Sequence, residues 1–231
     1  MSSKEARTEG RLRARPVQVT EAAPVGLQPL ALGAARDSYL YVPVGYRAER
    51  PVPLVLLLHG AGGHARQGLD LLRSLADAAG IILLAPASRD QTWDLLVGRR
   101  YGPDAAVIDR ALEQTFSRYA IDPARLAIGG FSDGASYALS LGITNGDLFT
   151  HVLAFSPGFV APAGQTGAPR IFVSHGTRDG VLPIDRCSRR IVPELRQGGY
   201  EVTYREFDGG HEISPEIAVE AVGWFAREKL P

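Results

Sequence analysis

The side chain best placed for nucleophilic chemistry is Ser132, in the segment Gly130-Phe131-Ser132-Asp133-Gly134. An apolar stretch precedes this segment and a helical pattern follows it, so the serine falls in a strand-to-helix turn. Glycines two residues before and two residues after a serine let backbones pass closely, and the serine then occupies a strained turn with its hydroxyl presented. On this motif alone, an ordinary turn with a helix-capping serine explains the residues equally well.

A serine hydroxyl is a poor nucleophile until an imidazole accepts its proton, and that imidazole needs a carboxylate to fix its tautomer. We predict His211 as the base, because it lies in a glycine-rich loop after the last predicted strand and before the last helix. His175, which ends a strand, is the main rival. We expect it to pack and to hydrogen-bond beneath the loop that carries the acid. The remaining histidines are His59, His64 and His151.

The predicted acid is Asp179, in the segment Ser174-His175-Gly176-Thr177-Arg178-Asp179-Gly180 that directly follows another strand. Asp185 is an alternative, but it lies deeper in a predicted helix. Asp208 is too near His211 in sequence to orient it easily. Serine, acid and histidine would thus each follow a strand of their own, in an order that one large class of serine hydrolases uses.

A glycine-rich loop, His59-Gly60-Ala61-Gly62-Gly63, follows the first buried strand. The tetrahedral intermediate of acyl transfer places negative charge on an oxygen, and fixed backbone amides can stabilise it. We predict that the amides of Ala61 and Asp133 form this oxyanion hole. Phosphate binding is a weaker interpretation, because no lysine followed by serine or threonine completes a phosphate-binding loop.

The elements that must position these residues alternate between apolar strands and helical patterns. Extended segments are predicted at residues 12–20, 27–32 and 37–42, and buried strands at 53–58, 81–85, 126–128, 151–155, 170–174 and 202–207. Helices are predicted at residues 69–79, 103–119, 135–141, 185–197 and 215–225, with Pro193 expected to bend the fourth helix or end an early part of it. This α/β pattern predicts a mostly parallel central sheet with helices on both faces and an antiparallel N-terminal edge. In such folds the site lies at the carboxyl ends of the strands.

The composition of the chain excludes several classes of protein. The 231 residues include 25 basic and 25 acidic side chains, so the net charge of zero argues against a nucleic-acid binder. Cys187 is the single cysteine, which excludes an intrachain disulfide and suggests a bystander thiol. We find no apolar stretch long enough for a signal peptide or a membrane span and expect a cytoplasmic protein.

Two regions are expected along the chain. Residues 1–20 read as a charged leader, solvated and partly disordered, and residues 21–231 as a single catalytic domain without a large lid. The leader's basic side chains are Arg7, Arg11, Arg13 and Arg15.

Four motifs together give the chain a family resemblance. They are LLLHGAGG ending at Gly63, GGFSDGAS from Gly129 to Ser136, SHGTRDGVLP from Ser174 to Pro183, and GGHEIS from Gly209 to Ser214. With these residues, the chain from residue 52 onward resembles the bacterial phospholipase/carboxylesterase group of α/β-hydrolases, which includes dienelactone-hydrolase-like members. The resemblance implies hydrolysis of a small-molecule ester or thioester through an acyl-serine intermediate, without metal or cofactor.

The resemblance also suggests that loops after other strands line the acyl pocket. By position, Gly62, Trp93 with Asp94, and Phe159 would contribute, although ordinary packing explains Trp93 and Phe159 equally well. Two departures stand out: Asp133 replaces the glutamine that many relatives carry after the nucleophile, and Ser132 replaces the cysteine of dienelactone hydrolases.

We therefore expect a serine carboxylesterase for short- to medium-chain acyl esters. A thioesterase, a polyester or aromatic-ester hydrolase, and a non-catalytic binding protein on the same scaffold are the alternatives. A homodimer is a further expectation.

Overall fold

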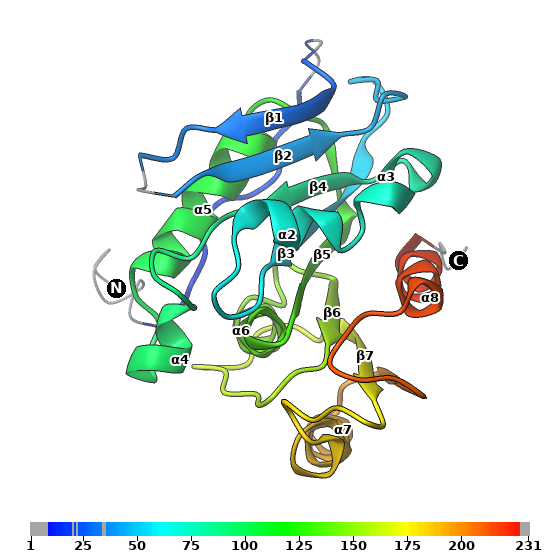
Figure 1. The fold of residues 1–231 in the computed structure, drawn as a ribbon. Coiled ribbons are helices and arrows are strands. Elements are labelled where there is room, and N and C mark those ends of the chain that lie inside the picture. The colour runs from blue at the N-terminus through cyan, green and yellow to red at the C-terminus, as the bar shows by residue number, and fades with distance from the viewer. Residues whose placement is uncertain (1–8, 20, 22, 34–35, 227–231) are drawn as a thin grey trace.

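Eight strands form one sheet in the computed structural model of the protein, which describes residues 9–19, 21, 23–33 and 36–226. Their order is β1-β2-β4-β3-β5-β6-β7-β8. The strands are β1 Gly26–Leu30, β2 Ser38–Val42, β3 Val52–Leu58, β4 Ile82–Ala85, β5 Ile121–Phe131, β6 His151–Phe155, β7 Arg170–Gly176 and β8 Val202–Phe207. Strands β3 to β8 run parallel to one another, whereas β1 and β2 pair antiparallel, which confirms the predicted α/β sheet with its antiparallel N-terminal edge (Figure 1).

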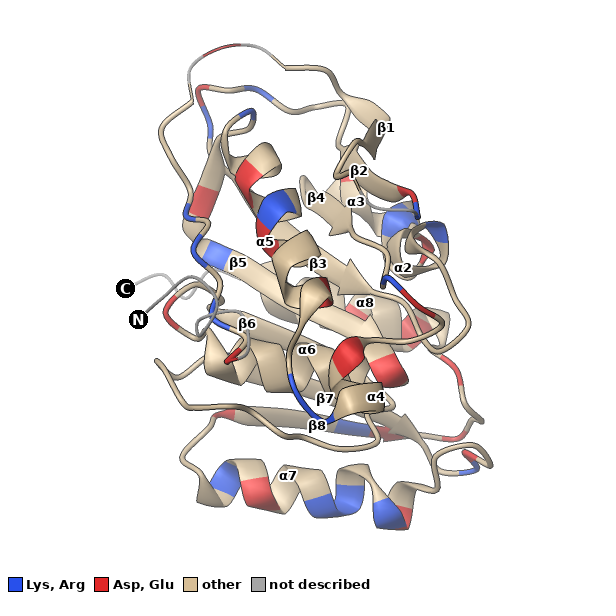
Figure 2. Cartoon of the chain, turned by 90° about the vertical axis from the view of Figure 1, so that its left-hand side faces the viewer, with Lys and Arg blue, Asp and Glu red and all other residues tan. Residues whose placement is uncertain are grey.

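Helices cover both faces of this sheet. They are α2 Ala65–Asp70, α3 Arg73–Ala79, α4 Asp94–Gly98, α5 Pro103–Phe116, α6 Asp133–Thr144, α7 Ser188–Gln197 and α8 Pro215–Ala226. One apolar core joins the sheet to α4, α5, α6 and α7, and a second joins it to α2, α3 and α8. Figure 2 shows α7 beside β7 and β8 at the outer edge, with charged residues of both signs along it.

The sheet has continuous apolar strands because both faces are covered. Leu54 through Leu58 in β3 are fully buried, and their alternating side chains enter the two cores. Strand β5 extends well beyond the predicted residues 126–128, since residues 122–125 of its first half, which include Pro123 and Arg125, are partly or fully exposed and form no apolar run. All the parallel strands point their carboxyl ends to one edge, where the predicted triad residues follow β5, β7 and β8.

Three helical details differ from the sequence prediction. The helix expected over residues 69–79 is two helices, α2 and α3, because Leu72 leaves the helical region with φ −130° and ψ 3°. A short helix, α4, had no periodic signal. The helix expected over residues 185–197 is interrupted at Cys187, where a 3₁₀ turn over Ile184–Arg186 ends, and α7 then continues through Pro193.

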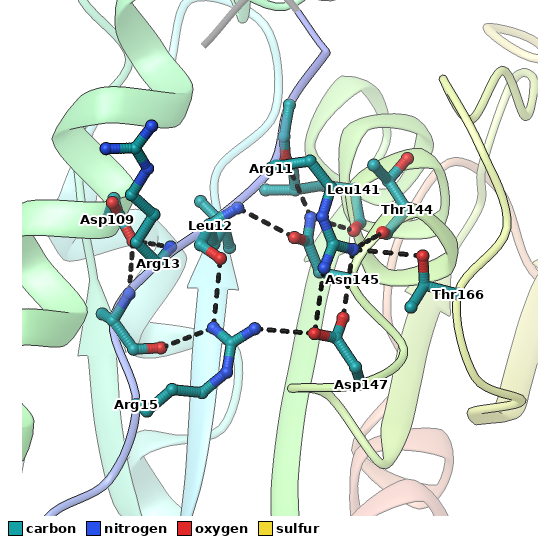
Figure 3. A network of polar contacts seen from close by, with 12 residues as sticks. Arg11, Leu12, Arg13, Arg15, Asp109, Leu141, Thr144, Asn145, Asp147 and Thr166 are labelled. Atoms are coloured by element: carbon teal, nitrogen blue, oxygen red, sulfur yellow. Dashed lines mark hydrogen bonds and ion pairs between the residues drawn. The ribbon is translucent and has the colours of Figure 1, made fainter. Parts of the chain in front are cut away.

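The N-terminal segment is also placed differently from the solvated leader that the sequence suggested. Residues 1–8, including Arg7, and residue 20 lie outside the described residues. Leu12, however, is 2% exposed within the core, and its amide donates to Asn145 Oδ1 at 2.8 Å. Arg11 and Arg15 pair with Asp147, as Figure 3 shows. The sequence pattern failed here because the polar partners that anchor the segment lie more than a hundred residues away.

Candidate active site

Ser132 occupies the turn between β5 and α6 in a conformation that non-glycine residues rarely adopt, with φ 57° and ψ −120°. Such strain costs about 1–3 kcal/mol and persists only where the surroundings enforce it. Here, the Ser132 amide donates to the carbonyl of Phe155 at 2.9 Å. Gly134 lets α6 approach β3 closely, because a Cβ at this position would lie 2.2 Å from the carbonyl oxygen of Leu58. The strand-to-helix turn predicted from the motif is therefore present.

The structure brings the three predicted triad side chains together. Ser132 Oγ lies 2.9 Å from His211 Nε2, and His211 Nδ1 lies 2.6 Å from Asp179 Oδ2. The aromatic ring of Phe131 packs against the His211 imidazole, with 4.6 Å between the ring centroids. Ser132 is 8% exposed and the Asp179 side chain is fully buried. This continuous chain of contacts can transfer a proton away from the serine hydroxyl.

Asp179 is held as a carboxylate by several donors. Its Oδ1 accepts hydrogen bonds from the amides of Val181 and Leu182 at 2.9 and 2.8 Å. Burial alone would raise the pKa of Asp179, but the hydrogen bonds from His211 and from these two amides outweigh it and lower the pKa below its usual value.

The loops that carry Asp179 and His211 are bonded to each other. The amide of Thr177 donates to the Phe207 carbonyl at 2.8 Å, and that of Arg178 donates to the Gly209 carbonyl at 2.9 Å. At Gly176, any side chain would collide, because a Cβ would lie 2.2 Å from the carbonyl oxygen of Gly210. This glycine lets two loops from neighbouring strands meet and sets the distance between acid and base.

The two rival acids lie elsewhere. Asp208 forms an exposed ion pair with Arg178, and Asp185 forms one with Arg189 at 2.8 Å. Neither carboxylate has a hydrogen bond to His211 in the described part of the chain. The structure thus agrees with the choice of Asp179 on geometry.

The loop predicted to form the oxyanion hole lies against the nucleophile, since a Cβ on Gly60 would be 3.5 Å from the Cβ of Ser132. No hydrogen bond among the described residues uses the amide of Ala61. Asp133 is the first residue of α6, so its amide has no acceptor within the helix. Gly62 differs, because its amide donates to the Gln91 carbonyl at 2.7 Å. Ala61 and Asp133 therefore retain the free amides that an oxyanion needs.

His59 holds this loop in place through hydrogen bonds, a role that was not predicted from the sequence. The Ser88 amide donates to His59 Nε2 at 3.1 Å, so the proton lies on Nδ1, which donates to the Gly60 carbonyl at 2.8 Å. Burial lowers the pKa of His59 and keeps the ring neutral. The indole N–H of Trp93 donates to the His59 carbonyl at 2.9 Å.

This contact changes the interpretation of Trp93. Its side chain is 0% exposed and packs between His59 and Tyr137, so it supports the oxyanion loop and does not line an open pocket. Phe159 is half-buried and packs against the core, and Gly62 is exposed with φ +68°.

Asp94 is likewise engaged within the fold. Its carboxylate accepts from the Tyr137 hydroxyl at 3.1 Å and from the Asp104 amide at 2.8 Å. Burial raises the pKa of Asp94. Beside it, a cavity of about 400 Å³ lies between residues 89 and 104, with Thr92, Val97, Tyr101 and Arg100 among its lining residues.

This cavity is linked to the nucleophile through Thr92, whose hydroxyl donates to Asp133 Oδ2 at 2.6 Å. The contact also explains the unusual residue after the nucleophile: the Asp133 side chain binds the neighbouring loop, and its backbone amide stays free.

A row of hydroxyl groups follows the nucleophile along α6. Ser136, Ser140 and Thr144 each donate to the carbonyl four residues earlier, at 3.2, 2.8 and 2.8 Å. The same three oxygens accept from amides of the segment after β6, those of Gly158, Ala161 and Ala163. The spacing of four residues in the sequence was the available signal for this row, and it was not recognised.

The remaining predictions concern cysteine, metals and membranes. Cys187 is a buried free thiol whose pKa is raised by burial, in agreement with a bystander role. Across residues 9–226 as described, no group of three or more His, Cys, Asp and Glu side chains is arranged to hold a metal ion. The described helices include none with the length and apolar character to cross a membrane.

Comparison with known proteins decides the family. A family model described as Phospholipase/Carboxylesterase matches residues 104–225, more than half of the chain. The chain belongs to the phospholipase/carboxylesterase family. It is a serine hydrolase of the carboxylic ester hydrolase class, as the resemblance of the four motifs predicted.

Individual proteins named esterases or thioesterases are similar over about half of the chain or more. A protein named probable feruloyl esterase C from Aspergillus flavus is 25% identical over 213 residues, which cover 78% of this chain and 77% of the relative. Acyl-protein thioesterase 1 from Gibberella zeae is 30% identical over 122 residues, covering 48% of this chain and 51% of the relative. The crystal structure of esterase PE8 has the same fold, with a TM-score of 0.67 and 24% identity over 87% of this chain and 98% of that one.

Proposed function

We propose that this member of the phospholipase/carboxylesterase family hydrolyses short- to medium-chain acyl esters through an acyl enzyme formed on Ser132. The observation that supports this most directly is the hydrogen-bonded chain from Ser132 through His211 to Asp179, with distances of 2.9 and 2.6 Å. In this mechanism His211 accepts the serine proton as Oγ attacks the ester carbonyl, and it then donates that proton to the leaving alcohol. Asp179 orients the imidazole and stabilises its protonated form.

The amides of Ala61 and Asp133 would hold the oxyanion of the tetrahedral intermediate. Each such donor contributes roughly 3–4 kcal/mol to transition-state stabilisation. The Asp133 amide also lies at the N-terminus of α6, where the helix dipole favours negative charge. Water activated by His211 would then attack the acyl enzyme and release the acid.

Access to this site supports small, soluble substrates. Between β6 and β7, residues 156–169 contain no helix, so this connection holds no large lid. The cavity beside Thr92, of about 400 Å³, has room for a small acyl or alcohol group.

A second candidate function is hydrolysis of aromatic esters. It is favoured by the similarity to proteins named feruloyl esterase C, which extends over 78% of this chain. We expect the two substrate classes to separate in a panel that compares p-nitrophenyl acetate, butyrate and octanoate with methyl ferulate and with an acyl thioester. A higher kcat/KM for methyl ferulate than for every aliphatic ester would assign the aromatic-ester function.

The nucleophile is tested by replacing Ser132 with alanine. Hydrolysis of p-nitrophenyl acetate should fall by about 10⁶-fold, and labelling by a fluorophosphonate probe should be lost. Ser156→Ala is a matched control, because Ser156 is also a buried serine with positive φ, 52°, at the end of the adjacent strand β6. The proposal fails if Ser132→Ala retains most of its activity or its labelling.

Two further expectations stay predictions. The predicted cytoplasmic location can be tested by fractionating cells that express the chain at natural levels. The predicted homodimer can be tested by measuring the molar mass of the purified protein by light scattering.

A further inference from the structure

A second histidine, His175, contacts the acid of the triad. His175, near the end of β7, is 0% exposed. Its Nε2 lies 2.8 Å from the carbonyl oxygen of Leu182 and 3.2 Å from Asp179 Oδ2. On the other side of the ring, Nδ1 lies 2.7 Å from the hydroxyl of Ser188, the first residue of α7.

These contacts fix the tautomer of the ring. Both neighbours of Nε2 are acceptors, because one is a carbonyl oxygen and the other a carboxylate oxygen. The proton must therefore lie on Nε2, and Nδ1 accepts the proton of the Ser188 hydroxyl. Burial lowers the pKa of His175, so the ring stays neutral and still donates from Nε2.

We propose that His175 is a positioning residue of the triad, which holds the Asp179 carboxylate in the plane that His211 requires, and that the Ser188 hydroxyl holds the His175 ring in place for this task. The inference rests on the proposed function, since it assigns a role through Asp179. It extends the sequence interpretation, which gave His175 only packing and hydrogen bonding beneath the acid loop.

The need for this donor follows from the surroundings of Asp179. The two backbone amides tether only Oδ1, and the side chain has no exposed surface through which water can reach Oδ2. Oδ2 therefore has two N–H neighbours, His211 Nδ1 at 2.6 Å and His175 Nε2 at 3.2 Å, and the second N–H is shared with the Leu182 carbonyl. Since the His211 imidazole gains and loses a charge during the reaction while the His175 ring stays neutral, His175 is the contact that does not change.

The Leu182 carbonyl ties the same contact to the acid loop. His175 Nε2 donates to the Leu182 carbonyl, the Leu182 amide donates to Asp179 Oδ1, and Nε2 lies 3.2 Å from Asp179 Oδ2, so the three residues are in mutual contact. Loss of the His175 donor would release both the carboxylate and the loop. A displacement of about 1 Å in a catalytic group can reduce turnover by roughly 100-fold.

A double-mutant cycle tests this role. His175→Leu removes the donor, and we expect kcat for p-nitrophenyl acetate to fall by roughly 10- to 100-fold with KM little changed. In an Asp179→Ala background the same substitution should change kcat less than about 2-fold, because the carboxylate that His175 positions is absent. An equal loss in both backgrounds, or no loss in the intact background, would overturn the proposal.

Two variants keep the test decisive if His175→Leu does not fold. His175→Gln places an amide N–H near the position of Nε2 and should recover most of the activity. Ser188→Ala keeps Asp179 and His175 but removes the hydroxyl that holds the His175 ring at Nδ1, and it should lower kcat by a few-fold. If Gln recovers nothing and Ser188→Ala has full activity, His175 has no positioning role. Ser132→Ala separates this failure from failure of the proposed function, because it abolishes acyl transfer whatever His175 does.

Discussion

The two ends of α6 use their backbone groups in opposite ways. At the N-terminal end, Ser132 is strained at φ 57° and the amide of Asp133 has no acceptor within the helix. At the C-terminal end, the last four carbonyl oxygens all accept hydrogen bonds. The residues with these carbonyls are Leu141, Gly142, Ile143 and Thr144, and the donors are Asn145, Thr166 and Arg11.

The C-terminal end is covered by the N-terminal segment of the chain. Asn145, which is fully buried, donates to the Gly10 carbonyl and accepts from the Leu12 amide, both at 2.8 Å (Figure 3). The Arg11 guanidinium, which donates to the Thr144 carbonyl, also places positive charge where the helix dipole is negative. The comparison indicates that stability is concentrated at one end of α6, whereas strain and unoccupied amides are kept at the end that reacts.

The largest expected effect that would sharpen this comparison comes from Ser132→Gly. Activity should fall by about 10⁶-fold, while the free energy of unfolding should rise by about 1 kcal/mol, because glycine relieves the positive-φ strain. Chemical denaturation measures the second quantity. Ser132→Ala is the control, since it removes the hydroxyl and retains the Cβ. Equal stability of the two variants would show that the turn stores no strain.

The second prediction concerns His151, at the start of β6 and therefore at the edge of the sheet opposite the site. Burial, together with the nearby charge of Arg170, lowers the pKa of His151 to about 4. The unfolded chain binds a proton near pH 6.5 and the folded chain does not, so stability falls as the pH drops from about 6.5 to 4, by up to about 3 kcal/mol.

Replacing His151 with phenylalanine should remove this part of the acid sensitivity and keep a ring against Trp224 and Phe225. Urea unfolding at pH 7 and pH 4.5 measures the difference between the two proteins. If the original protein and His151→Phe lose the same free energy of unfolding between these pH values, His151 does not cause the acid sensitivity.

A third prediction concerns Asn145 itself. Asn145→Ala should reduce the free energy of unfolding by about 2–3 kcal/mol, because the buried amide of Leu12 and the carbonyl of Gly10 lose their partner. The kcat of the folded fraction should stay the same, since the substitution is at the opposite end of α6. Thermal unfolding and active-site titration measure the two quantities. A loss of kcat larger than the loss of folded protein would contradict the separation of the two ends.

The smallest effect is expected at Arg11. Its ion pair with Asp147 is about one-third exposed, so Arg11→Ala should cost about 1 kcal/mol or less, and less still at high salt. Arg11→Lys is the matched control, because it keeps the charge and loses the paired donors. Unfolding experiments at two salt concentrations check both. If Arg11→Ala lowered the free energy of unfolding by much more than Asn145→Ala does, the guanidinium of Arg11, and not the buried amide of Asn145, would be the main attachment of the N-terminal segment.

The meeting of the three triad side chains could be predicted from the sequence because each one follows a strand. The carboxyl ends of parallel strands meet at one edge, so Ser132, Asp179 and His211 could be brought together from chain order alone. The buried strands were recognised for the same reason, as both faces are apolar.

Positions set by contacts between distant segments were not predictable in this way. The sequence left Trp93 open between lining the acyl pocket and ordinary packing, and it packs on His59 through a contact that no local pattern indicates. Leu12 reads as part of a charged segment until Asn145 is known to bind its amide. The support that His59 gives to the oxyanion loop depends on the Ser88 amide, which lies in the following loop.

The hydroxyl row of α6 has a mechanical consequence. Because Ser136, Ser140 and Thr144 fasten residues 158–163 to the helix that begins at Ser132, a displacement of this segment would be transmitted to that helix. The loop over residues 89–104 is joined to the same helix by two side chains, the Thr92 hydroxyl on Asp133 and the Asp94 carboxylate on the Tyr137 hydroxyl. Changes in substrate range are therefore best engineered at cavity-lining positions of the latter loop that make neither contact, such as Val97 and Arg100.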